Sequence, residues 1–270
     1  MPSGNAGTEN GDGLSKKHNF NRFNTFIFDL DGTLWKWNKL IPGAQETIAA
    51  LQKAKKNVII ITNNTMITRR GLVNRLNKMG IRIKEKQLIS PNVVAAEYFK
   101  KKARRKKILV IGKGMQDDLK NAGLKVTNKI PADIVLIGQD MNFNYMKIMT
   151  AFAALQRGAK FYGATDAKKF IVGNEIWPGT GVLVKAVEAV SGKKAEIIGK
   201  PSVHMARVLK KLNPSRPRKT VLIGDSYKID IKFGKKLGYY TVLVKSGIKK
   251  KPIRGLKPNE ILKSVADIKI

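Results

Sequence analysis

The stretch from residue 25 to residue 33 constrains the fold of this chain more than any other part of the sequence. Residues 25–28, Thr-Phe-Ile-Phe, are apolar and β-prone, which predicts a buried strand. Asp29 and Asp31 come at the end of that strand, and side chains two residues apart in extended backbone lie on the same side. Two carboxylates this close favour a divalent cation or a proton on one of them. Gly32 then allows a sharp turn, and a polar strand end followed by a turn, without any ligand, is the alternative for this motif taken alone.

Strand and helix patterns alternate along the chain. Residues 44–54 have apolar side chains at helical spacing, and the apolar run 58–61 after them predicts a second buried strand. A strand, a helix and a strand in this order predict a βαβ unit, and similar alternation continues to about residue 244. The predicted fold is therefore α/β, with a Rossmann-like, doubly wound parallel sheet.

Several local predictions accompany this fold. Thr68 and Ser202 are predicted helix N-caps, and Ser90-Pro91 predicts a helix with proline at its first position. The segment 261–265 predicts a final helix. Five side chains at helical spacing are expected in the core: Tyr145, Ile148, Met149, Phe152 and Leu155.

Three more polar clusters lie at predicted strand ends or just beyond them. They are Thr62-Asn63, Lys200, and Asp225 with Asp230. Ligands bind at the carboxyl ends of the strands in an open parallel sheet, so these positions are candidates for the same site as the first Asp pair. Each cluster alone has a simpler interpretation, because Thr-Asn-Asn is usually a turn, Gly-Lys-Pro a loop and Gly-Asp after a strand a helix cap.

The composition excludes several classes of site. The 270 residues include no cysteine, so disulfides, thiolate metal sites and cysteine nucleophiles are absent. His18 and His204 are the only histidines, which argues against a histidine-ligated zinc site or a histidine phosphatase. No apolar run approaches the roughly 20 residues that a membrane span needs. Residues 1–20 are rich in Gly, Asn and Ser and predict a disordered tail, and the expected location is the cytoplasm, without membrane association.

The charge is unusual for a chain of this size. Lysine and arginine number 53 against 19 acidic residues, giving a formal net charge of +34. A small phosphorylated substrate does not require so much charge, whereas association with a polyanion fits it. The densest basic runs are 100–107 and 249–251, although a charge run is most often only a solvated face.

Taken in order, the four clusters resemble the motifs of the haloacid dehalogenase (HAD) superfamily of phosphotransferases. The matching segments are Asp-Leu-Asp-Gly-Thr, Thr-Asn-Asn, Gly-Lys-Pro and Gly-Asp-(four residues)-Asp. The insert between the second and third motifs is similar to the α/β cap of subclass IIA, which contains para-nitrophenylphosphatases, phosphoglycolate phosphatases and nucleotide monophosphatases. The resemblance covers roughly residues 25–270. It implies an HAD core formed by residues 21–86 and 178–270, with a smaller inserted α/β cap at 87–177.

The resemblance also implies catalytic roles. Asp29 would attack phosphorus and form an aspartyl-phosphate, and Asp31 would protonate the leaving oxygen and later activate water. Mg²⁺ would be held by Asp29, the backbone carbonyl of Asp31 and Asp225, which are hard oxygen ligands.

Phosphate binding would fall to three other residues. Thr62, Lys200 and the backbone of Asn63 would contact phosphoryl oxygens, and Asp230 would orient Lys200 or metal-bound water.

Two segments of the sequence depart from the family pattern. Ile229 replaces the usual threonine before the last aspartate, and residues 163–168, Gly-Ala-Thr-Asp-Ala-Lys, replace a segment that usually reads close to Ala-Thr-Asn-Pro-Asp. The second departure affects the identity of the substrate and not the reaction.

Two functions remain open from the sequence. The first is a Mg²⁺-dependent phosphomonoester hydrolase that acts on a small phosphorylated metabolite. The second is an HAD-fold protein associated with RNA or the ribosome through its basic surface, with weak or vestigial phosphatase activity. The sequence leaves the substrate and the oligomeric state open, a homodimer included.

Overall fold

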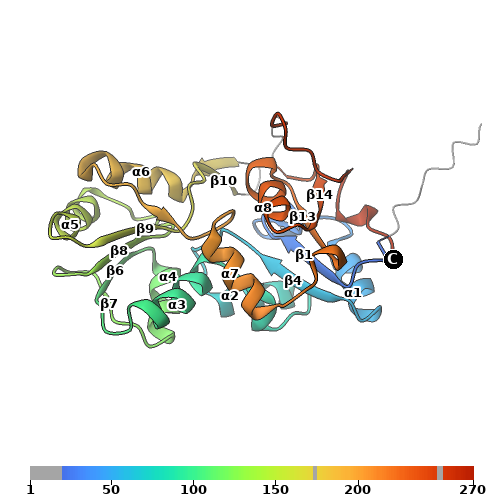
Figure 1. Cartoon of the computed structure of the whole chain (residues 1–270), viewed down its shortest axis with the longest axis horizontal. Coiled ribbons are helices and arrows are strands. Elements are labelled where there is room, and N and C mark those ends of the chain that lie inside the picture. The colour runs from blue at the N-terminus through green and yellow to red at the C-terminus, as the bar shows by residue number, and fades with distance from the viewer. Residues whose placement is uncertain (1–19, 173–174, 248–251) are drawn as a thin grey trace, which may run out of the picture.

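The computed structural model describes residues 20–172, 175–247 and 252–270, in which two parallel sheets lie side by side along the long axis of the molecule (Figure 1). The first sheet has the strand order β15-β14-β13-β1-β4-β5, and the second has the order β12-β9-β8-β6-β7. All pairings within these two sheets are parallel. The predicted α/β class with a doubly wound parallel sheet is confirmed.

The first sheet is covered by helices on both faces. Alternate residues of its central strand point to opposite faces, so Phe26 and Phe28 pack with α1 and α2 while Ile27 packs with α7 and α8. Its strands are β1 (Thr25–Asp29), β4 (Asn57–Ile61), β5 (Leu88–Ile89), β13 (Thr220–Gly224), β14 (Tyr240–Val244) and β15 (Glu260–Leu262). Its helices are α1 (Ala44–Lys53), α2 (Arg69–Lys78), α7 (Val203–Leu212) and α8 (Lys232–Lys236).

The second sheet has the same layered construction. Ile108 and Val110 pack on the side of α3 and α4, and Leu109 and Ile111 pack on the side of α5 and α6. Its strands are β6 (Ile108–Ile111), β7 (Val126–Thr127), β8 (Ile134–Ile137), β9 (Lys160–Gly163) and β12 (Glu196–Ile197). Its helices are α3 (Pro91–Lys102), α4 (Lys113–Asn121), α5 (Tyr145–Gln156) and α6 (Thr180–Ser191).

The chain passes from the first sheet to the second after β5, close to the predicted boundary at residue 87, but it returns only after β12, about 20 residues beyond the predicted boundary at residue 177. Strand β5 still pairs with β4 of the first sheet, and β12 still pairs with β9 of the second. One apolar cluster runs from the first sheet through α3 and α7 into the second sheet. The division into core and cap at residues 87 and 177 stays a prediction.

Two antiparallel hairpins were not anticipated from the sequence. They are β2 (Trp35–Lys36) with β3 (Lys39–Leu40), and β10 (Lys169–Val172) with β11 (Glu175–Pro178). Aromatic rings connect them: the centroid of Phe170 lies 6.4 Å from that of Trp37 and 6.4 Å from that of Trp177. The hairpins therefore join the two halves of the molecule beside the strand ends.

The predicted helix starts agree with the structure. The Thr68 hydroxyl accepts a hydrogen bond from the Gly71 N–H at the start of α2, and the Ser202 hydroxyl accepts one from the Met205 N–H at the start of α7. Pro91 is the first residue of α3, as predicted.

The predicted helix at 261–265 is wrong. Residues Glu260–Leu262 form strand β15, which pairs with β14, and a short 3₁₀ turn follows at Val265–Asp267. Leu262 and Val265 are buried against the first sheet. A pattern of so few apolar residues is compatible with a short edge strand or with a helical turn. The strand forms here because it can pair with the open edge of β14.

The predicted core face of α5 is wrong in part. The helix forms, but Tyr145 is 72% exposed and Met149 is 46% exposed. The buried residues are Ala151, Ala154 and Leu155. Small side chains on that face allow α5 to approach α6 and the sheet closely, so the larger residues turn outward.

The predicted tail, residues 1–20, falls almost entirely outside the described residues. Phe20 is described, and its ring is buried among the apolar residues of the first sheet, so the core begins one residue earlier than predicted. None of the helices in the described ranges has both the length and the apolarity that a membrane span requires.

Candidate active site

The polar residues predicted to form one site come together at the carboxyl ends of three adjacent strands. Asp29 ends β1, Thr62 follows β4 and Asp225 follows β13, and β1 pairs with both of the other strands. Lys200 reaches the same place from the loop after β12, and Asp230 lies on a π-helical turn, Tyr227–Ile231. This is the edge at which an open parallel sheet binds its ligands.

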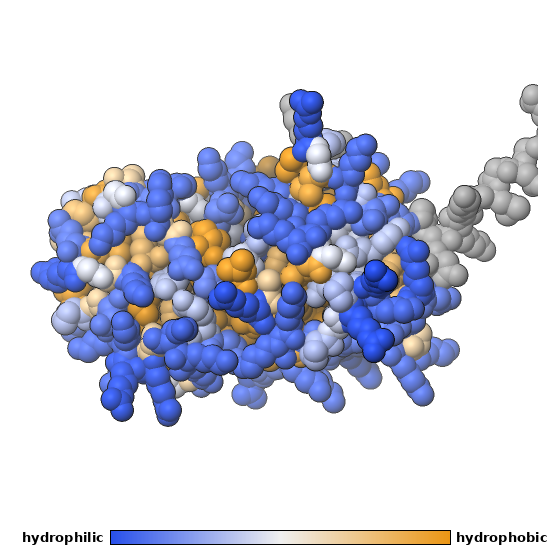
Figure 2. Space-filling view, viewed as in Figure 1, coloured by the Kyte–Doolittle hydropathy of each residue, from blue (hydrophilic) through white to orange (hydrophobic). Residues whose placement is uncertain are grey.

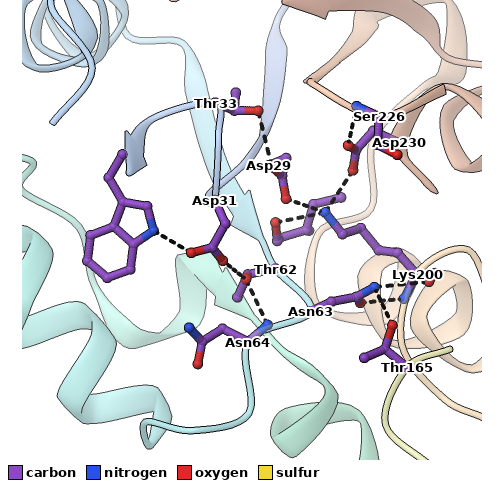
Figure 3. A network of polar contacts seen from close by, with 12 residues as sticks. Asp29, Asp31, Thr33, Thr62, Asn63, Asn64, Thr165, Lys200, Ser226 and Asp230 are labelled. Carbon is purple, nitrogen blue, oxygen red and sulfur yellow. Dashed lines mark hydrogen bonds and ion pairs between the residues drawn. The ribbon is translucent and has the colours of Figure 1, made fainter. Parts of the chain in front are cut away.

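Lys200 is the centre of the network in Figure 3. Its side chain is 1% exposed, and its Nζ lies 2.5 Å from Asp29 Oδ1, 2.8 Å from Asp230 Oδ1 and 3.3 Å from the Ile61 carbonyl oxygen. Burial alone would lower the pKa of the Lys200 ammonium, but the two carboxylates outweigh it and raise that pKa above its ordinary value. An ammonium has three N–H donors, and all three have acceptors here. Lys200 is therefore a fixed positive charge beside Asp29.

The charge on Asp29 is opposed by its burial and by the other carboxyl groups of the site. Burial raises its pKa well above the usual value; Lys200 opposes this, and the charges of Asp230, Asp225 and Asp31 add to it. The Thr33 hydroxyl also donates to Asp29 Oδ2, at 3.1 Å. Four carboxyl groups thus lie in a site with one buried ammonium, which contacts two of them, Asp29 and Asp230, so acidic groups outnumber basic ones.

Asp31 points away from Asp29, toward other partners. Trp35 Nε1 donates to Asp31 Oδ1 at 2.8 Å, and the Thr62 hydroxyl donates to Asp31 Oδ2 at 3.1 Å (Figure 3). Burial raises the pKa of Asp31, against these two hydrogen bonds, which lower it. Asp29 and Asp31 are both at the end of β1, as expected. Their carboxylates contact different partners, because the turn that begins after β1 points the two side chains in different directions.

The donor set fits a hard divalent cation. Asp29, Asp225 and Asp230 are all buried, and each offers a carboxylate oxygen within 4.8 Å of the others. Carboxylate oxygens are the ligands that Mg²⁺ prefers, and a 2+ charge would offset the acidic excess. The carboxylate of Asp225 sits against two glycines: a Cβ at Gly32 or Gly247 would lie 2.8 Å or 2.0 Å from its Oδ2. A larger residue at either position would displace that carboxylate.

Asn63 has a role that the sequence did not reveal. Its Oδ1 accepts from the Lys200 N–H at 2.8 Å, and its Nδ2 donates to the Lys200 carbonyl oxygen and to the Thr165 hydroxyl, both at 3.1 Å. The side chain therefore fixes the backbone of Lys200 across 137 positions of sequence. The family motif predicted backbone contact to phosphate, and no local pattern points to this side-chain pairing.

Replacing Asn63 with alanine should lower the free energy of unfolding by about 1–3 kcal/mol, because the buried backbone groups of Lys200 lose their partners. Hydrolysis should slow as well, since the ammonium would no longer be held in place. Chemical denaturation and phosphate release measure the two effects. Thr165→Val is the control, as it removes only one of the three hydrogen bonds of Asn63, together with the one that the Thr165 hydroxyl accepts from the Ala167 N–H at 3.2 Å. Equal effects of the two variants on both measurements would contradict the role given to Asn63.

A pocket of about 790 Å³, including open solvent, lies in front of Asp29 and Lys200. The second sheet and the β10–β11 hairpin supply one wall, with Gln139, Thr165, Lys169 and Phe170. Gln139 is tied to the loop after β4, because its N–H donates to the Thr65 hydroxyl at 2.7 Å. The pocket is therefore enclosed by both halves of the molecule and suits a small molecule.

Comparison with known proteins gives a consistent result. A model described as haloacid dehalogenase-like hydrolase matches residues 26–125, and an HAD-hydrolase-like model matches residues 197–268. Chronophin of Mus musculus is 30% identical over 264 residues, covering 90% of each chain. A dihydroxyacetone phosphatase of Corynebacterium glutamicum is 29% identical, again covering 90% of each. The p-nitrophenyl phosphatase structure from Archaeoglobus fulgidus superposes with a TM-score of 0.84 at 25% identity, covering 91% of this chain and 97% of that one.

Proposed function

Since the chain belongs to the haloacid dehalogenase-like hydrolase family and is a phosphatase with a subclass IIA cap, we propose that it hydrolyses a small phosphorylated metabolite through an aspartyl-phosphate on Asp29. The observation that carries this proposal is the placement of Asp29 at the end of β1, bonded to a buried Lys200 and facing the pocket. Mg²⁺ is the proposed cofactor, held by Asp29, Asp225 and the Asp31 carbonyl, with the Asp230 carboxylate close to the same cluster.

The proposed reaction has two steps. An Asp29 carboxylate oxygen attacks phosphorus, the bond to the leaving oxygen breaks, and Asp31 gives that oxygen its proton. Asp31 then takes a proton from water, and the water oxygen attacks phosphorus and releases phosphate and free Asp29. Bound Mg²⁺ would offset the negative charge shared by Asp29 and the phosphoryl oxygens.

Other residues of the chain support these steps. Thr62, the Asn63 backbone and Lys200 are the proposed phosphate-binding groups, and Lys200 reduces the repulsion between Asp29 and an incoming phosphate. Asp230 holds Lys200 through its 2.8 Å contact. The segment 87–177 is the proposed cap, which shields the site from bulk water during transfer and opens for release.

The proposal is tested by measuring phosphate release from a panel of phosphorylated metabolites, with and without Mg²⁺. We expect Mg²⁺-dependent turnover of at least one small phosphomonoester. A panel with no turnover above the uncatalysed rate under any metal condition would contradict it.

Lys169 is expected to select substrates that carry a second anionic group. Among the residues that line the pocket, Lys169 and Lys200 are the two cationic side chains, and Lys200 is fully engaged by its three acceptors. Lys169 is exposed at the wall and is free to meet an anion. Lys169→Ala should raise KM about tenfold for phosphoglycolate, which carries a carboxylate, because a charge-assisted hydrogen bond is lost. KM for p-nitrophenyl phosphate should not change.

The neighbouring Lys168 supplies the control for this prediction. It is also exposed but does not line the pocket, so Lys168→Ala changes the charge by the same amount beside the site. Steady-state kinetics of both variants on both substrates measure the difference. Equal changes in KM for the two variants would show that only the overall charge matters.

A further inference from the structure

The basic run 100–107 forms an exposed corner of the second sheet. It covers the last turn of α3, the turn after it and the residue before β6. Its seven lysines and arginines are all exposed, whereas Ala103 in its middle is buried. Within the described part of the chain, no carboxylate forms an ion pair with any of these seven side chains. The run is thus a concentration of uncompensated charge.

The topology of the sheet brings more charge to this corner. Strands that run parallel start at one edge, and the helices that return to that edge end there. Lys120 lies in the last turn of α4, and Lys125 precedes β7, with its carbonyl oxygen 2.8 Å from the Ile108 nitrogen. We call these residues together the basic corner: Lys100, Lys101, Lys102, Arg104, Arg105, Lys106, Lys107, Lys120 and Lys125.

Among the described residues, Asp133 and Glu97 form no ion pair with the side chains of the basic corner. Asp133 Oδ2 accepts from the Lys107 backbone N–H at 2.7 Å, and Glu97 pairs with Lys211 of α7 at 2.5 Å. Cations in the last turn of a helix also interact favourably with the helix dipole. That effect accounts for residues 100–102 and Lys120, but not for 104–107 or Lys125, which lie beyond the helix ends.

The basic corner lies at the edge of the second sheet opposite the pocket. The pocket residues Gln139 and Thr165 follow the carboxyl ends of β8 and β9, while the corner surrounds the amino ends of β6 and β7. Figure 2 shows hydrophilic side chains projecting from the lower left of the molecule, where Figure 1 places α3 and β7. A large partner at this corner would leave the pocket open.

The surroundings of the corner favour one kind of polyanion. The apolar side chains of α3, such as Val94 and Phe99, are buried, so this helix has no apolar face to insert into a membrane surface. No aromatic ring is exposed in the basic corner, so it offers no stacking platform for the bases of a single strand. Because α3 packs between α4 and α7, it cannot enter a major groove and read base edges either.

We propose that the basic corner binds the phosphodiester backbone of a nucleic-acid duplex, without reading its sequence. This function is separate from hydrolysis, because the corner and the pocket lie at opposite edges of the second sheet. The second basic run, 249–251, falls among residues that the structure does not describe and has no part in the proposal.

The test uses the full chain and labelled RNA and DNA duplexes of about 16 base pairs, a length that one compact domain can span. Fluorescence anisotropy gives the affinity at about 50 mM and about 200 mM salt. The test variant carries Lys101→Glu, Arg104→Glu and Arg105→Glu. The matched control carries Lys78→Glu, Arg82→Glu and Lys86→Glu, three exposed cations of the first half with the same change in charge.

The parent chain should bind both duplexes, with log affinity falling steeply with log salt. If the three cations each neutralise a phosphate, the test variant should flatten that slope by about 2 to 3, and the control variant should leave it nearly unchanged. Thermal denaturation and hydrolysis of p-nitrophenyl phosphate should be the same in all three proteins, which shows that they are folded.

Three results would each overturn the proposal. They are no duplex binding at the lower salt concentration, an equal loss of slope in the control variant, and equal or tighter binding to vesicles that contain anionic lipid. The last result would assign the corner to a membrane surface.

Discussion

Asp29→Asn should abolish hydrolysis of every substrate found for this protein. An amide cannot form the phospho-enzyme, and the uncatalysed reaction is so slow that enzymes accelerate phosphomonoester hydrolysis by up to about 10²¹-fold. Loss of the covalent route should therefore lower kcat by several orders of magnitude. The fold should survive, because the amide keeps an oxygen for the Lys200 ammonium and Asp230 still compensates that charge. Phosphate release at saturating substrate measures the first effect, and thermal denaturation the second.

A partly buried carboxylate outside the pocket provides the control for this experiment. Asp118 of α4 accepts hydrogen bonds from Asn92 Nδ2 and the Arg69 N–H, both at 2.9 Å, and it does not line the pocket. Asp118→Asn makes the same chemical change and should cost stability without loss of turnover. Near-normal turnover of Asp29→Asn would refute the covalent mechanism.

Removal of divalent cations should have a comparably large effect. Excess EDTA should abolish turnover and added Mg²⁺ should restore it, because the site holds four carboxyl groups and one buried ammonium, and phosphate would add further negative charge. Mg²⁺ should also raise the thermal midpoint of the parent protein, since a ligand that binds the folded state stabilises it.

A variant of Asp225 distinguishes the loss of Mg²⁺ from other effects of the chelator. Asp225→Ala should lose most of the stabilisation by Mg²⁺ while remaining folded, because this carboxylate belongs to the proposed ligand set. Gly247→Ala should weaken Mg²⁺ binding in the same direction, since its Cβ would lie 2.0 Å from Asp225 Oδ2. Full activity in excess chelator would rule out the ligand set.

The features that the sequence predicted correctly are local ones. A run of apolar β-prone residues ending in Asp29 predicts a buried strand with a polar end, and hydroxyl residues before apolar-periodic segments predict the caps at Thr68 and Ser202. The four short motifs each follow a predicted strand, and this was enough to predict that Asp29, Thr62 and the other site residues meet at one edge of a parallel sheet.

The features that it missed depend on neighbours distant in the chain. Strand β15 forms because β14 presents an open edge, and the sequence of residues 260–265 alone does not indicate that this edge is there. The outward direction of Tyr145 is set by how closely α5 approaches α6. The pairing of Asn63 with the Lys200 backbone depends on the loop after β12, which joins the second sheet to the site.

The strand order of the first sheet has a consequence for synthesis on the ribosome. Strand β1 lies between β4, which follows it closely, and β13, whose Val221 pairs with Phe26. At about 5–20 residues per second, the roughly 200 residues between those partners take about 10 to 40 s to be made. All five strands of the second sheet are complete before β13 emerges. Once β12 has been made, the nascent chain therefore carries a complete second sheet while one edge of β1 is still unpaired, and an unpaired strand edge is prone to misassembly.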